Sequence, residues 1–132
     1  MPTAFADIGP EPVDTLPPAI ARRLGELRDI AQNENAIYSQ VSAEQLRAFI
    51  AANGVTRRPL LSLLDNGNLR ALWDAPSGEQ VGLQFRGGSE IQFVFFARRF
   101  NPDGMMRSAG RDTIAGVAEQ IASLKLTGLL HV

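Results

Sequence analysis

The sequence predicts an α+β fold, in which two helices precede a four-stranded antiparallel meander and one helix follows it (ααββββα). Three observations support this prediction: two successive hairpin patterns between Pro59 and Arg99, helical apolar spacing before them, and helical apolar spacing after them. Strands grouped together with helices at both ends are typical of α+β proteins, whose helices cover one sheet face. The 132 residues suit a single domain.

Residues 1–16 are expected to form a flexible N-terminal arm, and residues 17–132 to form the domain. The arm contains Pro2, Pro10 and Pro12 among scattered acids and shows no apolar periodicity. The alternative is an arm that crosses onto a neighbouring subunit.

Two helices are predicted before the sheet. The first begins near Thr15, and apolar residues repeat in it at helical spacing, namely Ile20, Leu24, Leu27 and Ala31. The second contains the pattern of a capping box, with Ser42 as the N-cap and Gln45 three residues later. Val41 and Leu46 are placed as its hydrophobic staple, and Gly54 is expected to end it in a left-handed conformation.

The first hairpin pattern joins residues 60–64 to residues 69–73. Asn66-Gly67 between them is a strong signal for a two-residue type I′ turn, which needs positive φ at both central residues. That turn would set Leu64 opposite Leu69 and Leu60 opposite Trp73.

The second hairpin pattern joins residues 80–86 to the strand that begins at Ile91. A three-residue loop sets Phe85 opposite Ile91 and aligns the apolar rows of both strands on one face. A shift of one residue would put these rows on opposite faces, so the burial pattern favours the Phe85–Ile91 register.

The last part of the chain is predicted to be a loop over residues 100–110 and then a helix from about Arg111. Ile114, Val117, Ile121 and Leu124 form one stripe of that helix, with Asp112 or Ser108 as candidate N-caps.

Composition excludes several kinds of chemistry. The chain has no cysteine, so disulfides, thiolate nucleophiles and zinc–thiolate sites are ruled out. The one histidine, His131, lacks a nearby orienting partner in the sequence, and the carboxylates show no metal-ligand spacing. We therefore expect no enzyme activity, no metal site and no cofactor. A net charge of −1 also argues against a nucleic-acid partner.

No apolar run predicts a signal peptide or a membrane span, which leads us to expect a cytoplasmic protein. Arginines are the candidate ligand-binding residues, because Arg98, Arg107 and Arg111 could hold an anion between the helices and the sheet. The alternative is that these arginines are solvated and have no ligand.

Apolar residues outnumber the positions that three helices can cover. A helix covers a band about 10 Å wide, so three helices can cover one face of a four-stranded sheet but hardly two. The uncovered face is predicted to be an interface, and its candidate residues are Leu61, Leu63, Leu72, Val94 and Phe96. The terminal segments could instead fold over it.

The hairpin that ends in Trp73, followed by the second hairpin, resembles small bacterial α+β proteins with paired hairpins, some encoded beside toxin–antitoxin or mobile-element genes. The resemblance covers residues 60–99 and implies no functional residues. We therefore expect a non-catalytic interaction or regulatory protein, antitoxin-like or encoded with its partner, that binds a protein or a second copy of itself. The alternative is a small-ligand-binding protein with an arginine-anchored anion pocket.

Overall fold

A computed structural model describes residues 16–100 and 103–132 of the chain. The expected N-terminal arm lies outside the described residues, apart from Leu16, which is buried in the core. The elements follow in the order α2 (Pro18–Asn33), α3 (Gln40–Asn53), β1 (Leu60–Leu63), β2 (Leu69–Asp74), β3 (Gln80–Phe85), β4 (Ile91–Phe100), β5 (Asp103–Asp112), α4 (Ile114–Ser123) and the short 3₁₀ helix η2 (Thr127–Leu130).

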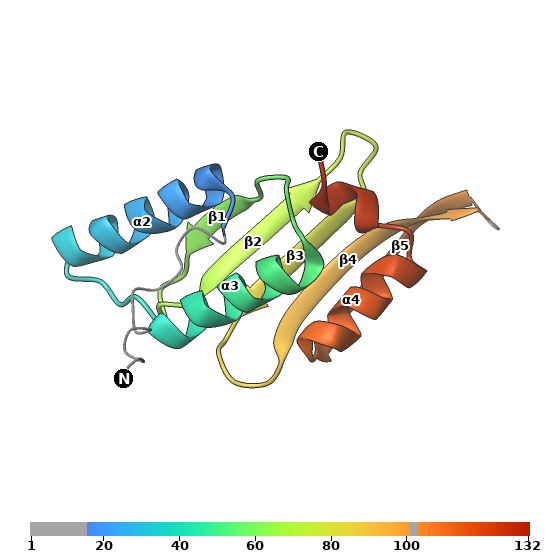
Figure 1. Ribbon diagram of the computed structural model, residues 1–132. Coiled ribbons are helices and arrows are strands. Elements are labelled where there is room, and N and C mark those ends of the chain that lie inside the picture. The colour runs from blue at the N-terminus through green and yellow to red at the C-terminus, as the bar shows by residue number, and fades with distance from the viewer. Residues whose placement is uncertain (1–15, 101–102) are drawn as a thin grey trace, which may run out of the picture.

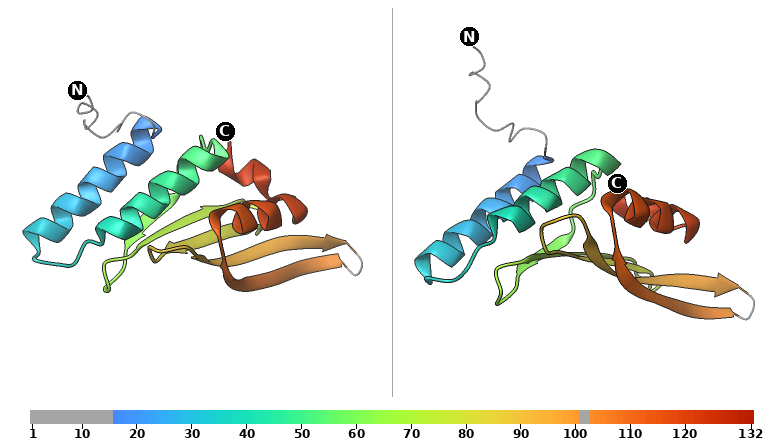
Figure 2. Two further views of the ribbon diagram at one scale, coloured as in Figure 1. Left: turned by 60° about the horizontal axis from the view of Figure 1, so that its bottom comes forward. Right: turned by 90° about the horizontal axis from the view of Figure 1, so that it is seen from below.

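The fold is α+β, and its sheet is an antiparallel meander in the order β1-β2-β3-β4-β5 (Figure 1). The helices of the described residues all lie on one face of this sheet, as the views in Figure 2 show. None of the helices described combines the length and the apolar character needed to cross a bilayer.

The fifth strand corrects the prediction of a loop over residues 100–110. β5 pairs with β4 without interruption from Ile91–Asp112 to Phe100–Asp103. Its sequence lacks aromatic and β-branched residues, so strand propensity alone did not reveal it. A Cβ on Gly110 would lie 3.3 Å from the ring of Phe93, so this glycine makes room for the aromatic side chain of the neighbouring strand.

The register of the first hairpin was predicted wrongly by one residue. Leu61 pairs with Ala71 and Leu63 with Leu69. The predicted type I′ turn needs positive φ at both Asn66 and Gly67. Only Gly67 has it, at 90°, so the turn is not type I′. The N–H of Gly67 donates to the carbonyl of Leu64, and the N–H of Leu64 donates to Asn68, which is the pattern of a type I turn followed by a glycine bulge.

The second hairpin confirms its predicted register, since Phe85 pairs with Ile91, Leu83 with Phe93 and Val81 with Phe95. These six side chains face the helices and are at most 5% exposed.

The core fills the space between the helices and the sheet. Phe49 of α3 packs its ring against those of Trp73 and Phe85, with centroids 6.3 and 6.0 Å away. The indole N–H of Trp73 donates to the carbonyl of Arg57. The burial of these rings supplies much of the hydrophobic stabilisation of the domain.

The capping box predicted for α3 is wrong, because the helix begins three residues earlier, with Ser39 instead of Ser42 as its N-cap. Ser42 is fully buried and joins two strands: its hydroxyl donates to the carbonyl of Phe85 and accepts from the N–H of Leu69. Val41 is exposed and lies against Gly87 of the second hairpin loop. The positive φ of Gly54 at the end of α3 is as predicted.

Gln45 is the second polar anchor of α3. Its amide nitrogen donates to the carbonyls of Gly88 and Glu90, and its amide oxygen accepts from the N–H of Gly87. One side chain thus bonds three main-chain groups of the β3–β4 loop.

The C-terminal helix also begins later than predicted. Arg111 belongs to β5, and Thr113 is the N-cap of α4, with its hydroxyl accepting from the N–H of Gly116. Neither Asp112 nor Ser108 is the cap.

Candidate functional site

The face of the sheet opposite the helices is the candidate functional site, and we call it the open face. Strand pairing places residues opposite one another on the same face, so the open face can be read from the register as rows that cross the strands. No helix of the described chain lies over it (Figure 2).

One row of the open face is apolar along its whole length. It crosses all five strands, from Leu60 through Leu72, Gly82 and Val94 to Ala109. Leu60 is 68% exposed, and Leu72 and Val94 are half-buried. Five strands at about 4.8 Å spacing give this row a width of roughly 20 Å.

Polar rows lie on both sides of the apolar row. One row carries two arginines and two glutamines, and it consists of Ser62, Arg70, Gln84, Gln92 and Arg111. The other consists of Asp74, Gln80, Phe96 and Arg107. The open face therefore combines a central apolar stripe with hydrogen-bonding and positively charged groups, the composition of a protein-binding surface with a polar rim.

Two shallow hollows mark this face. The smaller, of about 190 Å³, lies over Gly82 between Arg70 and Gln92, where the missing side chain leaves space in the apolar row. The larger, of about 400 Å³, lies over β4 and β5 and is lined by Arg86, Arg107, Arg111 and Gln92 among others.

The predicted interface residues divide between the two faces. Leu72, Val94 and Phe96 lie on the open face, as expected. Leu61 is 1% exposed and Leu63 packs against the core, so both face the helices. The error follows directly from the one-residue error in the register of the first hairpin, because a slip of one residue exchanges the faces.

Of the three predicted anion-binding arginines, Arg98 lines a hollow that Ser123 and Leu124 at the end of α4 also line, so it lies between a helix and the sheet as expected, whereas Arg107 and Arg111 do not. Arg107 and Arg111 lie on the open face and line the same hollow. Arg98 pairs with Met105 near the other end of β4 and lines a separate hollow with Arg99 and Lys125. Arg86 and Gln92 join the hollow of Arg107 and Arg111 but were not singled out from the sequence, because their shared location depends on the pairing of β4 with β5.

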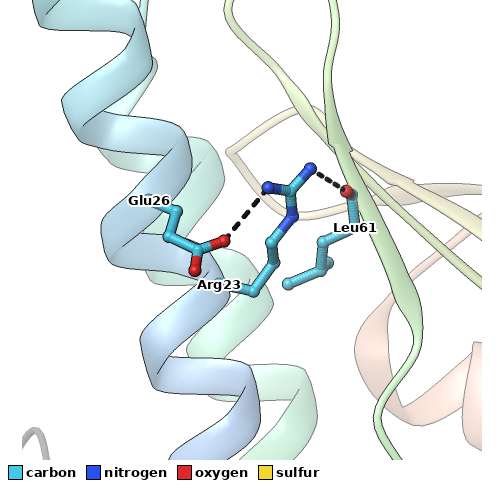
Figure 3. Close-up of polar contacts among 3 residues, drawn as sticks. All are labelled: Arg23, Glu26 and Leu61. Carbon is cyan, nitrogen blue, oxygen red and sulfur yellow. Dashed lines mark hydrogen bonds and ion pairs between the residues drawn. The ribbon is translucent and has the colours of Figure 1, made fainter.

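A groove of about 510 Å³ lies between α2 and β1. Arg23 crosses it: one guanidinium nitrogen donates to the carbonyl of Leu61 at 3.4 Å, and another pairs with Glu26 at 3.2 Å (Figure 3). The arginine thereby covers part of the free edge of the sheet. Burial raises the pKa of Tyr38, opposed by the positive charges of Arg28 and Arg47.

His131 is partly exposed beside the C-terminal residue. Within residues 16–100 and 103–132, no three histidine, aspartate or glutamate side chains gather closely enough to hold a metal ion. Comparison with known proteins finds no match to a family model, a curated protein or a solved structure.

Proposed function

We propose that this chain is a non-catalytic protein-interaction protein, of a regulatory or antitoxin-like kind, that binds a partner protein through the open face. The observation that carries the proposal is the apolar row from Leu60 to Ala109, which crosses the whole sheet on the side where no helix of residues 16–100 and 103–132 lies. Apolar surface gathered into a continuous patch with a polar rim is typical of interaction sites.

The composition of the rim indicates what the partner offers. Arg70, Arg107 and Arg111 are exposed on this face, whereas Asp74 and Asp103 are its acids in the described chain. An acidic partner surface with apolar side chains at its centre complements this arrangement, and the arginines would steer and orient it.

Site-specific photo-crosslinking tests the proposal. p-Benzoylphenylalanine replaces Val94 on the open face or, as the matched control, Ala48, which is exposed on α3. We expect a discrete protein adduct from position 94 only. The captured protein, once purified, should bind the unmodified chain, and Val94→Glu should weaken this binding about tenfold or more, as at an interface hot spot. Equal adducts from both positions, or an affinity that Val94→Glu leaves unchanged, would show that the open face is not the binding surface.

A second candidate function is anion binding in the hollow lined by Arg86, Arg107, Arg111 and Gln92. Three guanidinium groups and an amide can surround a phosphate or carboxylate group with donors. Titration with inorganic phosphate and with pyrophosphate, observed by NMR, should shift the signals of this hollow in the native chain and not in Arg107→Gln. Signals that do not move would remove this candidate.

A further inference from the structure

The two edges of the sheet are protected very differently. β1 has four residues, and the guanidinium group of Arg23 of α2 donates a hydrogen bond to the carbonyl of Leu61 at the edge of this strand. β5 has ten residues, and in the described part of the chain no strand pairs with its outer side. The strand order places β5 at the end of the sheet, and Figure 2 shows α4 on the same side of the sheet as α2 and α3.

β5 lacks three of the features that keep an edge strand from pairing, namely proline, lysine and a bulge, and its charged residues are Asp103, Arg107, Arg111 and Asp112. Its register with β4 is continuous. In an antiparallel ladder, alternate residues direct their N–H and C=O groups away from the neighbouring strand. About half of the main-chain groups along roughly 33 Å of β5 are therefore available to another strand.

We propose that the outer edge of β5 pairs with β5 of a second copy of this chain, antiparallel and about a two-fold axis, to form a continuous ten-stranded sheet. A two-fold axis perpendicular to the sheet gives each strand the same neighbour in the same register, so the contact is self-complementary and closed. Both open faces then lie on the same side of the joined sheet.

Charge selects the register of this contact. Residues opposite each other in an antiparallel pair have side chains on the same face of the sheet. Odd-numbered residues of β5 therefore pair with odd-numbered residues of the second copy, and even-numbered residues with even-numbered ones. This is possible only if the two-fold axis passes beside one residue, which then pairs with its own copy. With the axis at Ser108, Arg107 lies opposite Ala109 of the second copy and Arg111 opposite its Met105. With the axis at Arg107, two arginines lie opposite each other, and with the axis at Ala109, Arg107 lies opposite Arg111. The Ser108 register is thus the longest one without like charges opposite, and it spans residues 104–112.

Cysteine crosslinking tests the register, because the chain has no cysteine of its own. Opposite residues in an antiparallel pair have Cα atoms about 4.5–5.5 Å apart, within reach of a disulfide. Under mild oxidation we expect Ser108→Cys to form a disulfide-linked dimer much faster than Arg107→Cys and than the exposed loop control Ser89→Cys. Faster crosslinking of Arg107→Cys, or equal rates at all three positions, would overturn the proposal.

Complementary charge variants test the contact without a covalent bond. Sedimentation equilibrium should show twice the 14.3 kDa chain mass for the native protein at micromolar concentration. Ser108→Lys and Ser108→Glu each place like charges at the axis and should weaken dimerisation about fivefold or more, whereas their mixture should form a heterodimer.

The same measurement separates this edge contact from binding through the open face. Val94→Glu, which changes the open face alone, should leave the dimer intact. A monomeric native chain, a mixture of the two Ser108 variants that stays monomeric, or a dimer that Val94→Glu abolishes would each refute the edge pairing.

Discussion

The two faces of the sheet are made by alternate residues of the same strands, yet they differ in exposure, in polarity and in their cover by helices. The inner face presents rows such as Trp73–Val81–Phe95, which are at most 1% exposed and pack against the helices. The open face presents Asp74, Gln80 and Phe96 in the adjacent row, and none of the described helices lies over them.

This difference separates the face that stabilises the domain from the face that we propose binds a partner. Burial of apolar surface stabilises the domain almost entirely through the inner face, because only there do the helices exclude water. Side chains of the open face contribute little to that core, so they can serve a partner. Matched substitutions on the two faces should therefore differ in their effect on stability.

The largest effect is expected for a matched pair of phenylalanines. Phe85 is fully buried against Phe49, so Phe85→Ala should lower the free energy of unfolding by about 3–5 kcal/mol. Phe96 is half-buried on the open face, and Phe96→Ala should cost about 1 kcal/mol. Urea denaturation followed by tryptophan fluorescence measures both values. Equal losses would mean that the open face is as much a part of the core as the inner face.

A pair of serines tests the polar contacts in the same way. Ser42→Ala removes the partner of the Leu69 N–H and of the Phe85 carbonyl, and each buried group left without a partner costs roughly 1–3 kcal/mol. We expect a total loss of about 3 kcal/mol, whereas Ser62→Ala on the open face should stay within about 0.5 kcal/mol. A loss of only about 1 kcal/mol for Ser42→Ala would be the value expected of an ordinary helix cap and would contradict the bridging role.

Ser42 also shows what the sequence could and could not predict. Its place three residues before a glutamine resembles a capping box, and local pattern alone cannot tell a cap from a buried bridge. The distinction depends on where β2 and β3 meet α3, a contact between segments more than twenty residues apart. The presence of the helices and the register of the second hairpin were predictable because their apolar periodicity is strong, whereas the first residues of α3 and α4 were not.

The first hairpin was misaligned for a different reason. Asn-Gly suits both a two-residue type I′ turn and a type I turn with a glycine bulge, so the dipeptide did not decide the register. Face matching would have decided it: pairing Leu61 with Ala71 puts an entirely apolar set on the inner face and Ser62 outside. The composition of β5, by contrast, contains no such signal, and the strand forms because β4 offers it an edge.

The mildest expected effect comes from valine-to-threonine changes on adjacent strands, which preserve β-branching and size and add only a hydroxyl group. Val81 lies on β3 at 0% exposure between Trp73 and Phe95, so the hydroxyl of Val81→Thr loses water without a side-chain partner nearby. Burying such a group costs about 1–2 kcal/mol in proteins. Val94 lies half-exposed on the open face, where the hydroxyl of Val94→Thr can keep its contact with water, so the change in stability should stay below about 0.5 kcal/mol. Chemical denaturation of both variants beside the native chain gives the difference directly.

If Val94→Thr destabilised the chain as much as Val81→Thr, water would have to be excluded from the open face in solution, as a partner or a second copy lying over it would do. Repeating the measurement at falling protein concentration separates these cases, because only cover by another molecule weakens on dilution.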